Sequence, residues 1–234
     1  MDLVAPEISI VLPCRNEEPT IADAISSATR AFPNRRVEVI VSDSSTDRSP
    51  EIARGMGAIV VTPMTLGYGA AYRFGFQHCH GSFVAMADPD GTYDLMELPM
   101  LLAPMEEGRA DLVMGSRLKG EMEPGAMSAF KRHLGNPFLT WLLNMLFGVG
   151  VTDAHCGMRA LTVDALRRIE LRTTGMEFAS EMLVEARRAG LRIAEVPISY
   201  RRRKGTPSKL SSLRDGWRHV RYMVRARLGI GPYS

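Results

Sequence analysis

Two aspartates one residue apart, Asp88 and Asp90, end a short apolar run in the segment FVAMADPDGTYD. Pro89 and Gly91 are typical turn residues, so an ordinary turn accounts for the segment without any function. If the backbone leaves a sheet at Asp88, however, both carboxylates bend toward a common point. Hard oxygen ligands suit Mg²⁺ or Mn²⁺, whose other positions are filled by water and phosphate oxygens. The segment therefore predicts a metal site that holds a nucleoside diphosphate.

A second pair of carboxylates, Glu177 and Glu181 in GMEFASEML, has the i, i+4 spacing that puts two side chains on one face of a helix. Carboxylates placed in this way can act in acid-base chemistry or can support a site through their contacts. The nearby His155 and Cys156 are interpreted as structural.

Four apolar runs alternate with helical patterns in the first half of the chain, and they must position these side chains. The runs lie at residues 8–12, 37–43, 58–62 and 82–88, and the helical patterns begin after Thr20 and cover 51–57 and 68–79. The first helix is expected to bury Ile21, Ala24, Ile25 and Ala28. Short, nearly continuous apolar strands that alternate with helices predict an α/β fold with a mostly parallel, Rossmann-like sheet flanked by helices.

Polar loops follow three of the expected strands, at residues 13–17, 43–47 and 88–94. Ligands of parallel sheets bind beyond the carboxyl ends of the strands, so the three loops predict one shared ligand site. The first strand-to-helix loop, LPCRNEEPT, lacks the G-x-G-x-x-G fingerprint, and no Walker A sequence is present. These absences exclude a Rossmann dinucleotide site and a P-loop nucleotide site.

Composition and charge limit the classes of protein further. The 234 residues contain no linker-like stretch and predict a single domain over 1–234. Three widely separated cysteines indicate neither a disulfide framework nor a zinc site, and with no signal-peptide pattern at the N-terminus the expected location is the cytoplasm. Ten basic residues stand against one acidic residue between Arg201 and Arg227, although the net charge is only +3. This basic segment indicates an anionic partner, which could be phosphate, a membrane surface or nucleic acid.

The longest apolar segment, PFLTWLLNMLFGVGV at 137–151, is shorter than the roughly 20 residues that a membrane-spanning helix needs. With Phe138 and Trp141 beside a Lys-Arg-His sequence, it is either an interfacial helix or a core helix that closes the fold. Trp217 and Tyr222, which lie among arginines, indicate either a second interfacial element or a solvated amphipathic helix that packs on the body of the protein.

The motifs together resemble a known family. IVLPCRNEEPTI, VIVSDSSTDRSPEIA, LGYGAAYRFGF, VAMADPDGTYD and DLVMGSRL are followed by VTDAHCGMRAL, TGMEFASEMLVEA and EVPISYRRRKGTPSKL. In this order and spacing they resemble the family 2 glycosyltransferases, and within them the dolichol-phosphate mannose synthase-like branch. The resemblance covers almost the whole chain and implies the GT-A fold, a nucleotide-sugar donor, and inversion at the anomeric carbon.

The resemblance also implies roles for single residues. Asp88 and Asp90 match the metal-binding D-x-D pair, and Thr92 stands where members of this branch often have a Gln that contacts metal or phosphate. The residues expected to bind the donor or its phosphates are Pro13, Asn16, Glu17, Asp43, Ser45, Gly67, Asp88, Arg117, Arg202, Arg203 and Lys209. Those expected to serve catalysis are Asp90, Arg117, Glu177 and Glu181. The resemblance implies that a carboxylate near Glu177 and Glu181 acts as general base on an acceptor hydroxyl. An acceptor phosphate is already anionic and needs no base, and the two glutamates would then orient the acceptor or support the site. Arg202, Arg203 and Lys209 match a basic loop that closes over donor and acceptor phosphates.

The expected function is therefore inverting, metal-dependent transfer of a hexose from a GDP-mannose or UDP-glucose type of donor to a polyprenyl or dolichyl phosphate. Residues 1–118 would bind the nucleotide sugar, and residues 119–234, with the basic segment, would form the acceptor side. The alternatives are a soluble glycosyltransferase acting on a small-molecule or saccharide hydroxyl, a nucleotidyltransferase, or a protein that binds anionic surfaces. Further expectations are contact with the cytoplasmic face of a membrane, homo-oligomers, and no nucleic acid partner.

Overall fold

The computed structural model describes residues 5–204 and 212–230. Within these ranges seven strands form one sheet in the order β3-β2-β1-β4-β6-β5-β7. The strands are β1 (Ile8–Cys14), β2 (Val37–Asp43), β3 (Ile59–Val61), β4 (Phe83–Met86), β5 (Leu112–Ser116), β6 (Arg159–Thr162) and β7 (Ile193–Pro197). The α-helices are α1 (Ile21–Arg30), α2 (Ser49–Gly55), α3 (Tyr68–Phe76), α4 (Leu98–Glu106), α5 (Asn136–Phe147), α6 (Val163–Arg168), α7 (Phe178–Arg188) and α8 (Ser212–Arg227). A 3₁₀ turn η1 (Leu95–Glu97) precedes α4, and a π-helical turn η2 (Lys131–Gly135) precedes α5.

The sheet is parallel except at one strand. β1 pairs with β2 and β4 in parallel, β2 with β3, and β5 with β7, whereas β6 runs antiparallel to both β4 and β5. β5 ends at the carboxyl edge of the sheet, and the excursion through α5 returns to that same edge, so β6 has to run back in the opposite direction. The predicted α/β fold with a mostly parallel sheet flanked by helices is confirmed.

The apolar runs of the sequence account for the central strands and their helices. β1, ISIVLPC, is buried along nearly its whole length because helices cover both faces of the sheet. The face of α1 predicted to be buried is buried, and consists of Ile21, Ala24, Ile25 and Ala28. α5 ends where Gly148 takes a left-handed conformation with φ 64°, which glycine adopts at little cost.

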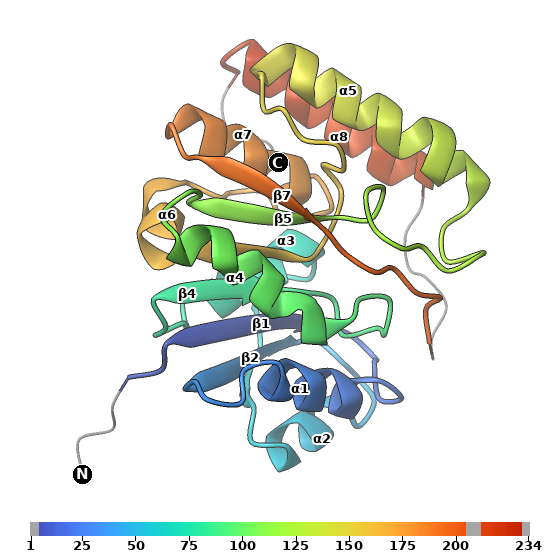
Figure 1. Ribbon diagram of the computed structural model, residues 1–234. Coiled ribbons are helices and arrows are strands. Elements are labelled where there is room, and N and C mark those ends of the chain that lie inside the picture. Colours follow the sequence, from blue (N-terminus) through green and yellow to red (C-terminus); the bar gives the residue numbers. More distant parts are fainter. Residues whose placement is uncertain (1–4, 205–211, 231–234) are drawn as a thin grey trace.

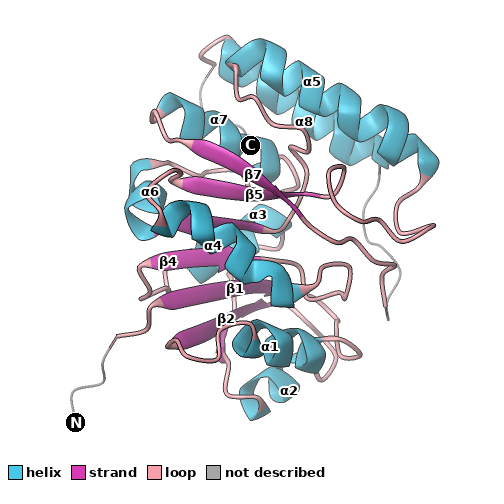
Figure 2. Cartoon of the chain, viewed as in Figure 1, coloured by secondary structure: helices cyan, strands magenta, loops and turns pink. Residues whose placement is uncertain are grey.

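Helices lie on both faces of the sheet (Figures 1 and 2). In the view of Figure 1, α4 lies in front of the sheet and α3 behind it, and α5 and α8 run side by side at the top. α7 contacts α3, α5 and α8, and so connects the sheet layer to this helical pair. The carboxyl ends of β1, β2 and β4 meet at one edge, where Cys14 is in register with Asp43 and the Ala87 N–H donates to the Val11 carbonyl.

Candidate donor-binding and metal site

The loops after β1 and β2 are joined by hydrogen bonds at the carboxyl edge of the sheet. Ser45 Oγ accepts from the Asn16 N–H at 2.8 Å and donates to Asp43 Oδ1 at 2.6 Å. Asn16 Oδ1 accepts from the Thr46 N–H at 2.7 Å, and Asn16 itself has a left-handed φ of 54°, which asparagine tolerates better than most residues. The residues predicted to bind the donor, Asn16, Asp43 and Ser45, therefore form one cluster. Pro13 lies near it as the second-last residue of β1.

Glu17 lies in the same loop and is buried, with 6% of its surface exposed. Its backbone N–H donates to Ser49 Oγ at 3.0 Å, which ties the loop to the start of α2. The carboxylate contacts the guanidinium of Arg203, from the basic segment at the other end of the chain. Glu17 and Arg203, 186 positions apart in sequence, thus meet at the carboxyl edge of the sheet.

The Asp90 carboxylate lies in the turn beyond β4 and is 7% exposed. Its Oδ1 accepts from the Thr92 N–H at 3.0 Å and from Thr92 Oγ1 at 2.6 Å, and its Oδ2 accepts from Arg203 Nη1. Gly91 between them has a φ of 77°, a conformation that favours glycine. Thr92 therefore orients Asp90, a different role from the direct metal or phosphate contact that a Gln at this position would make.

Asp88 is held from behind by α3 and by the loop before β6. Tyr72 Oη donates to Asp88 Oδ1 at 3.3 Å. A Cβ on Gly157 would lie 2.8 Å from Asp88 Oδ2 and 2.9 Å from Tyr68 Oη, so only glycine allows this close approach. Burial, followed by repulsion from the Asp90 carboxylate, raises the pKa of Asp88 to about 7. The Asp90 carboxylate thus lies close enough to Asp88 to disfavour its ionised form.

This donor set fits a divalent metal. Two carboxylates that repel one another are stabilised by a shared cation, and hard oxygen ligands match Mg²⁺ and Mn²⁺. Among the described residues no cluster of three or more His, Cys, Asp or Glu side chains occurs that could hold a metal by itself. A metal at Asp88 and Asp90 would therefore take its remaining ligands from water and from the donor's phosphates.

The start of the basic segment, through Lys204, lies along the Asp90 turn. Tyr200 pairs with Tyr93 in an isolated antiparallel bridge, and the N–H groups of Arg201 and Lys204 donate to the carbonyls of Thr92 and Asp90 at 2.8 and 3.2 Å. Of the predicted phosphate-binding residues, Arg203 reaches the carboxylates, whereas the Arg202 side chain points the other way and donates to the Pro124 carbonyl at 2.6 Å. Lys209 lies outside the described residues.

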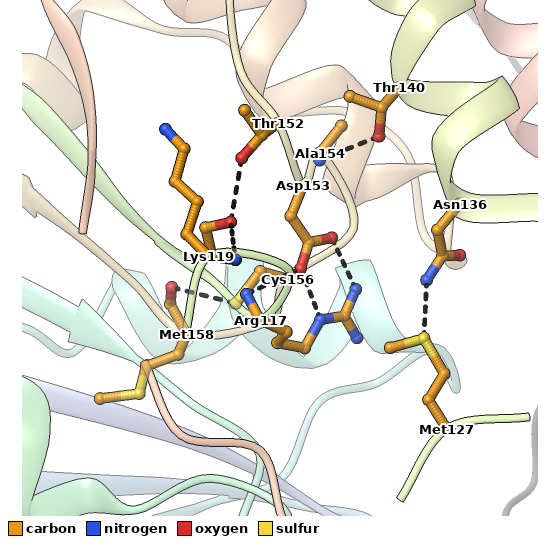
Figure 3. Close-up of polar contacts among 12 residues, drawn as sticks. Arg117, Lys119, Met127, Asn136, Thr140, Thr152, Asp153, Ala154, Cys156 and Met158 are labelled. Atoms are coloured by element: carbon orange, nitrogen blue, oxygen red, sulfur yellow. Dashed lines mark hydrogen bonds and ion pairs between the residues drawn. The ribbon is translucent and has the colours of Figure 1, made fainter. Parts of the chain in front are cut away.

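Arg117, just beyond β5, forms a buried ion pair (Figure 3). Its Nε and Nη2 donate to the two carboxylate oxygens of Asp153 at 2.7 and 2.8 Å, and its guanidinium lies 5.1 Å from the centre of the Tyr200 ring. Burial disfavours ionised Asp153, but Arg117 outweighs that effect and holds the pKa of Asp153 below its usual range. Arg117 is thus a buried, paired residue that supports the start of the basic segment, and its predicted contact with phosphate stays a prediction.

Glu177 and Glu181, the second carboxylate pair, bond to different parts of the chain. Glu177 precedes α7 and accepts from Nε and Nη2 of Arg218 in α8 at 2.6 and 2.9 Å. Glu181 is buried inside α7 and accepts from the N–H groups of Arg172 and Thr173 and from Thr173 Oγ1 at 2.6 Å. Burial raises the pKa of Glu181. The glutamates hold α8 and the loop before α7 in place.

Gly67, also assigned to the donor site, lets that loop approach α3. Its φ is 148°, and a Cβ there would lie 2.1 Å from the carbonyl oxygen of Thr174. The Ala70 N–H donates to the same carbonyl at 3.1 Å. Gly67 therefore joins the amino end of α3, which carries Tyr68 and Tyr72, to the loop that Glu181 organises.

Sequence reasoning missed several supporting residues. They are Tyr68, Tyr72, Asp153, Gly157 and Arg218, each of which contacts or lies against a predicted site residue. The i, i+4 spacing of Tyr68 and Tyr72 in LGYGAAYRFGF places both hydroxyls on one side of α3, and this spacing is the one available signal. The partners of Arg117 and Glu177 are distant in sequence and follow no local pattern.

A mixed α/β sheet with paired carboxylates beyond β4 is the arrangement of a GT-A glycosyltransferase, and similar proteins agree with this class. The model of the family described as "Glycosyl transferase family 2" matches residues 9–170. The chain belongs to this family, so the predicted family and enzyme class are confirmed. Membership also favours sugar transfer over the nucleotidyltransferase considered as an alternative.

Two curated relatives come from Haloferax volcanii. "Low-salt glycan biosynthesis hexosyltransferase Agl6" is 49% identical over 94% of this chain, but the chain spans only about half of that relative, 54% of its length. "Dolichyl-phosphate hexose transferase" is 36% identical over 85% of both chains.

A solved structure has a similar fold. It is glucosyl-3-phosphoglycerate synthase from Mycobacterium tuberculosis in complex with Mn²⁺, UDP and glucosyl-3-phosphoglycerate. It is 26% identical, with a TM-score of 0.76, and the match covers 97% of this chain and 81% of that one. The GT-A type of fold is thereby confirmed. None of the helices within residues 5–204 and 212–230 is long and apolar enough to cross a membrane.

Proposed function

We propose that the protein transfers a hexose, with inversion, from a nucleoside-diphosphate sugar of the GDP-mannose or UDP-glucose type to a polyprenyl phosphate such as dolichyl phosphate. The donor's base and ribose would lie against the cluster of Asn16, Asp43 and Ser45, and its diphosphate beside Asp88 and Asp90. Mg²⁺ or Mn²⁺ bound there would neutralise charge on the departing nucleoside diphosphate.

The transfer balances without a protein base. An oxygen of the acceptor phosphate forms a bond to the anomeric carbon while the bond from that carbon to the donor's diphosphate breaks. The bonding electrons leave with the nucleoside diphosphate. Because the attacking oxygen is already anionic, no proton has to be removed from it.

The contacts of Glu177 and Glu181 are the observation that favours a phosphate acceptor. A general base must be within reach of the proton that it removes. Glu177 is paired with Arg218, and both oxygens of Glu181 accept hydrogen bonds from the loop before α7. Neither glutamate is placed as a ready base, so an acceptor that brings its own anionic oxygen fits the site better than a neutral hydroxyl.

An exposed apolar row on α5 supports a lipid acceptor. Side chains spaced three or four residues apart lie about half exposed along this part of the chain, and they are Phe130, Leu134, Phe138, Trp141 and Met145. Arg132 and His133 are exposed beside them. An apolar row flanked by cations suits the surface of an anionic bilayer, and we propose peripheral contact through α5. α8 packs on the body through buried Tyr222, while Trp217 is exposed.

The second candidate is transfer to the hydroxyl of a small soluble acceptor. It is favoured by the likeness to a synthase whose structure contains a phosphoglycerate product rather than a lipid. The two candidates share the donor site and differ only on the acceptor side, which the fold does not determine.

A panel of donors and acceptors tests the proposal. GDP-mannose and UDP-glucose would each be incubated with Mg²⁺ or Mn²⁺ and either a short polyprenyl phosphate or 3-phosphoglycerate, and the glycosylated product would be measured by mass spectrometry. We expect product from the polyprenyl phosphate and none from the hydroxyl acceptor. Product from 3-phosphoglycerate alone would transfer the assignment to the second candidate.

Vesicle sedimentation tests the membrane contact separately. We expect the protein to sediment with vesicles containing phosphatidylglycerol and much less with phosphatidylcholine alone. The double variant Phe138→Ser, Trp141→Ser should lose this binding while it keeps its thermal transition. Equal sedimentation of the variant and the wild type would contradict a role for α5.

A further inference from the structure

Backbone hydrogen bonds fix the start of the basic segment, through Lys204, to the Asp90 turn. Two backbone hydrogen bonds and the Tyr93–Tyr200 bridge align residues 200–204 antiparallel to residues 90–93. The stem of Lys204 packs beside Gly91, where a Cβ would lie 3.5 Å from its carbons. This alignment places the side chain of Arg203 on the carboxylate side of the turn.

Arg203 bridges the two loops that follow β1 and β4. Its Nη1 donates to Asp90 Oδ2 and its Nη2 to Glu17 Oε1, and the side chain retains only 24% of its exposure. Asp90 Oδ1 already accepts two hydrogen bonds from Thr92. With Arg203 on Oδ2, both oxygens of Asp90 have protein donors.

The charges explain why a cation is needed there. Asp90 and Glu17 both contact this guanidinium and are themselves buried, and repulsion between buried carboxylates is costly. The guanidinium therefore acts as a counter-ion to Asp90, one of the two carboxylates that fit a divalent metal.

We propose that Arg203 is an internal counter-ion that exchanges with the divalent cation at Asp90. Arg203 holds residues 200–204 on the Asp90 turn until a metal binds, and it then leaves Asp90 Oδ2 and turns its guanidinium to the donor's diphosphate. Metal binding and the repositioning of Arg203 would thus be one coupled step. This inference rests on the proposed metal role of Asp88 and Asp90.

Arg201 provides a matched control on the same segment. It is also an ion-paired arginine, but its partner is Asp94 at 2.6 Å, and within the described part of the chain no hydrogen bond or ion pair joins its side chain to Asp90. Removing either arginine changes the net charge by the same amount. Only the removal of Arg203 frees an oxygen of Asp90.

Mn²⁺ titration without donor, with free Mn²⁺ measured by electron paramagnetic resonance, tests the exchange. We expect Arg203→Ala to bind Mn²⁺ about tenfold more tightly than the wild type, and Arg201→Ala to differ by less than about twofold, because only the first removes a competing cation. Arg203→Gln, which keeps most of the side chain's length, should behave like Arg203→Ala if the smaller residue disturbs folding.

Repeating the titration with UDP tests the second half of the exchange. In the wild type, UDP should tighten Mn²⁺ binding more than in Arg203→Ala, because only the wild type gains a guanidinium contact with the diphosphate. Arg203→Lys should recover part of this coupling. Equal Mn²⁺ affinities for the wild type, Arg201→Ala and Arg203→Ala would overturn the counter-ion proposal.

The same titration distinguishes this failure from failure of the metal assignment. Asp90→Asn should abolish Mn²⁺ binding at this site. If Asp90→Asn binds Mn²⁺ as the wild type does, the metal assignment fails, and the exchange fails with it. Transfer to polyprenyl phosphate is measured in a different assay and can succeed or fail independently.

Discussion

The two carboxylate pairs differ in what surrounds them. Asp88 and Asp90 lie on a turn beyond β4, and the Arg203 guanidinium from a distant segment contacts Asp90. Glu177 and Glu181 lie at the start of α7, and each is bonded to a different part of the chain. In the first pair the repulsion is concentrated at one point, whereas in the second it is relieved by separate donors. Close spacing in sequence therefore indicates a ligand site only where the fold leaves like charges together.

The comparison gives each pair a different expected response to neutral substitution. Replacement in the turn should reduce ligand binding and activity while stability is kept. Replacement in α7 should reduce stability while the folded fraction keeps its activity. A variant that shows the opposite pattern would contradict this difference between the two pairs.

Asp90→Asn should have the largest effect on activity. The amide oxygen can still accept the two Thr92 hydrogen bonds, so the turn should persist, but a neutral amide is a poor ligand for a hard cation. We expect at least about a hundredfold loss of transfer, roughly 2.7 kcal/mol, with a thermal midpoint within a few degrees of the wild type. The measurement is initial rate against donor concentration at saturating Mn²⁺, and activity within tenfold of the wild type would contradict the assignment.

Glu181→Gln should have the largest effect on stability. An amide presents one acceptor oxygen where the carboxylate presents two, so the Thr173 N–H loses one of its two acceptors and Thr173 Oγ1 has to accept from the new NH₂ group instead of donating. The expected cost is about 2 kcal/mol in the free energy of unfolding, measured by urea denaturation. The control is Glu185→Gln, one turn further along α7, whose surface pair with Arg188 is expected to contribute less than about 0.5 kcal/mol.

The kcat of folded Glu181→Gln distinguishes a structural role of Glu181 from a catalytic one. We expect kcat within about threefold of the wild type, since the carboxylate makes structural contacts. A hundredfold lower kcat with unchanged stability would instead identify Glu181 as the base and would favour a hydroxyl acceptor.

The sequence was sufficient to predict the rim of the sheet. Short apolar runs and turn residues predicted β1 to β4 within a few residues, and the cluster of Asn16, Asp43 and Ser45 follows from the rule that loops meet at the carboxyl ends of parallel strands. β6 and β7 were not anticipated. Their segments, RALT and IAEVP, are short, and β6 is antiparallel because of where the preceding excursion returns, which no local pattern encodes.

The contacts of the basic residues were the hardest to predict. Arg117 and Arg203 were both expected to meet phosphate, but their partners in the structure are Asp153 and the pair Asp90 and Glu17. These partners lie 36, 113 and 186 positions away in sequence. Pairing at such separations follows from the tertiary fold, since any arginine in the sequence is an equally good partner for any carboxylate.

Glu177→Gln should have a smaller effect on stability than Glu181→Gln. Its partner Arg218 is 40% exposed, so solvent weakens the ion pair. We expect a loss of about 1 kcal/mol. A double-mutant cycle with Arg218→Gln should give a coupling energy of up to about 1 kcal/mol. A coupling near zero would show that the contact holds α8 less firmly than its geometry indicates.

Thr92→Val should have the smallest effect, and it tests how the first pair is oriented. Valine has nearly the shape of threonine but removes the Oγ1 hydrogen bond to Asp90 Oδ1, while the backbone N–H still donates to the same oxygen at 3.0 Å. One of the two donors remains, so we expect Mn²⁺ affinity to fall by only about threefold, with Thr92→Ser close to the wild type. An effect as large as that of Asp90→Asn would mean that Thr92 contacts the metal directly, as a Gln at this position would, and that its bond to Asp90 is secondary.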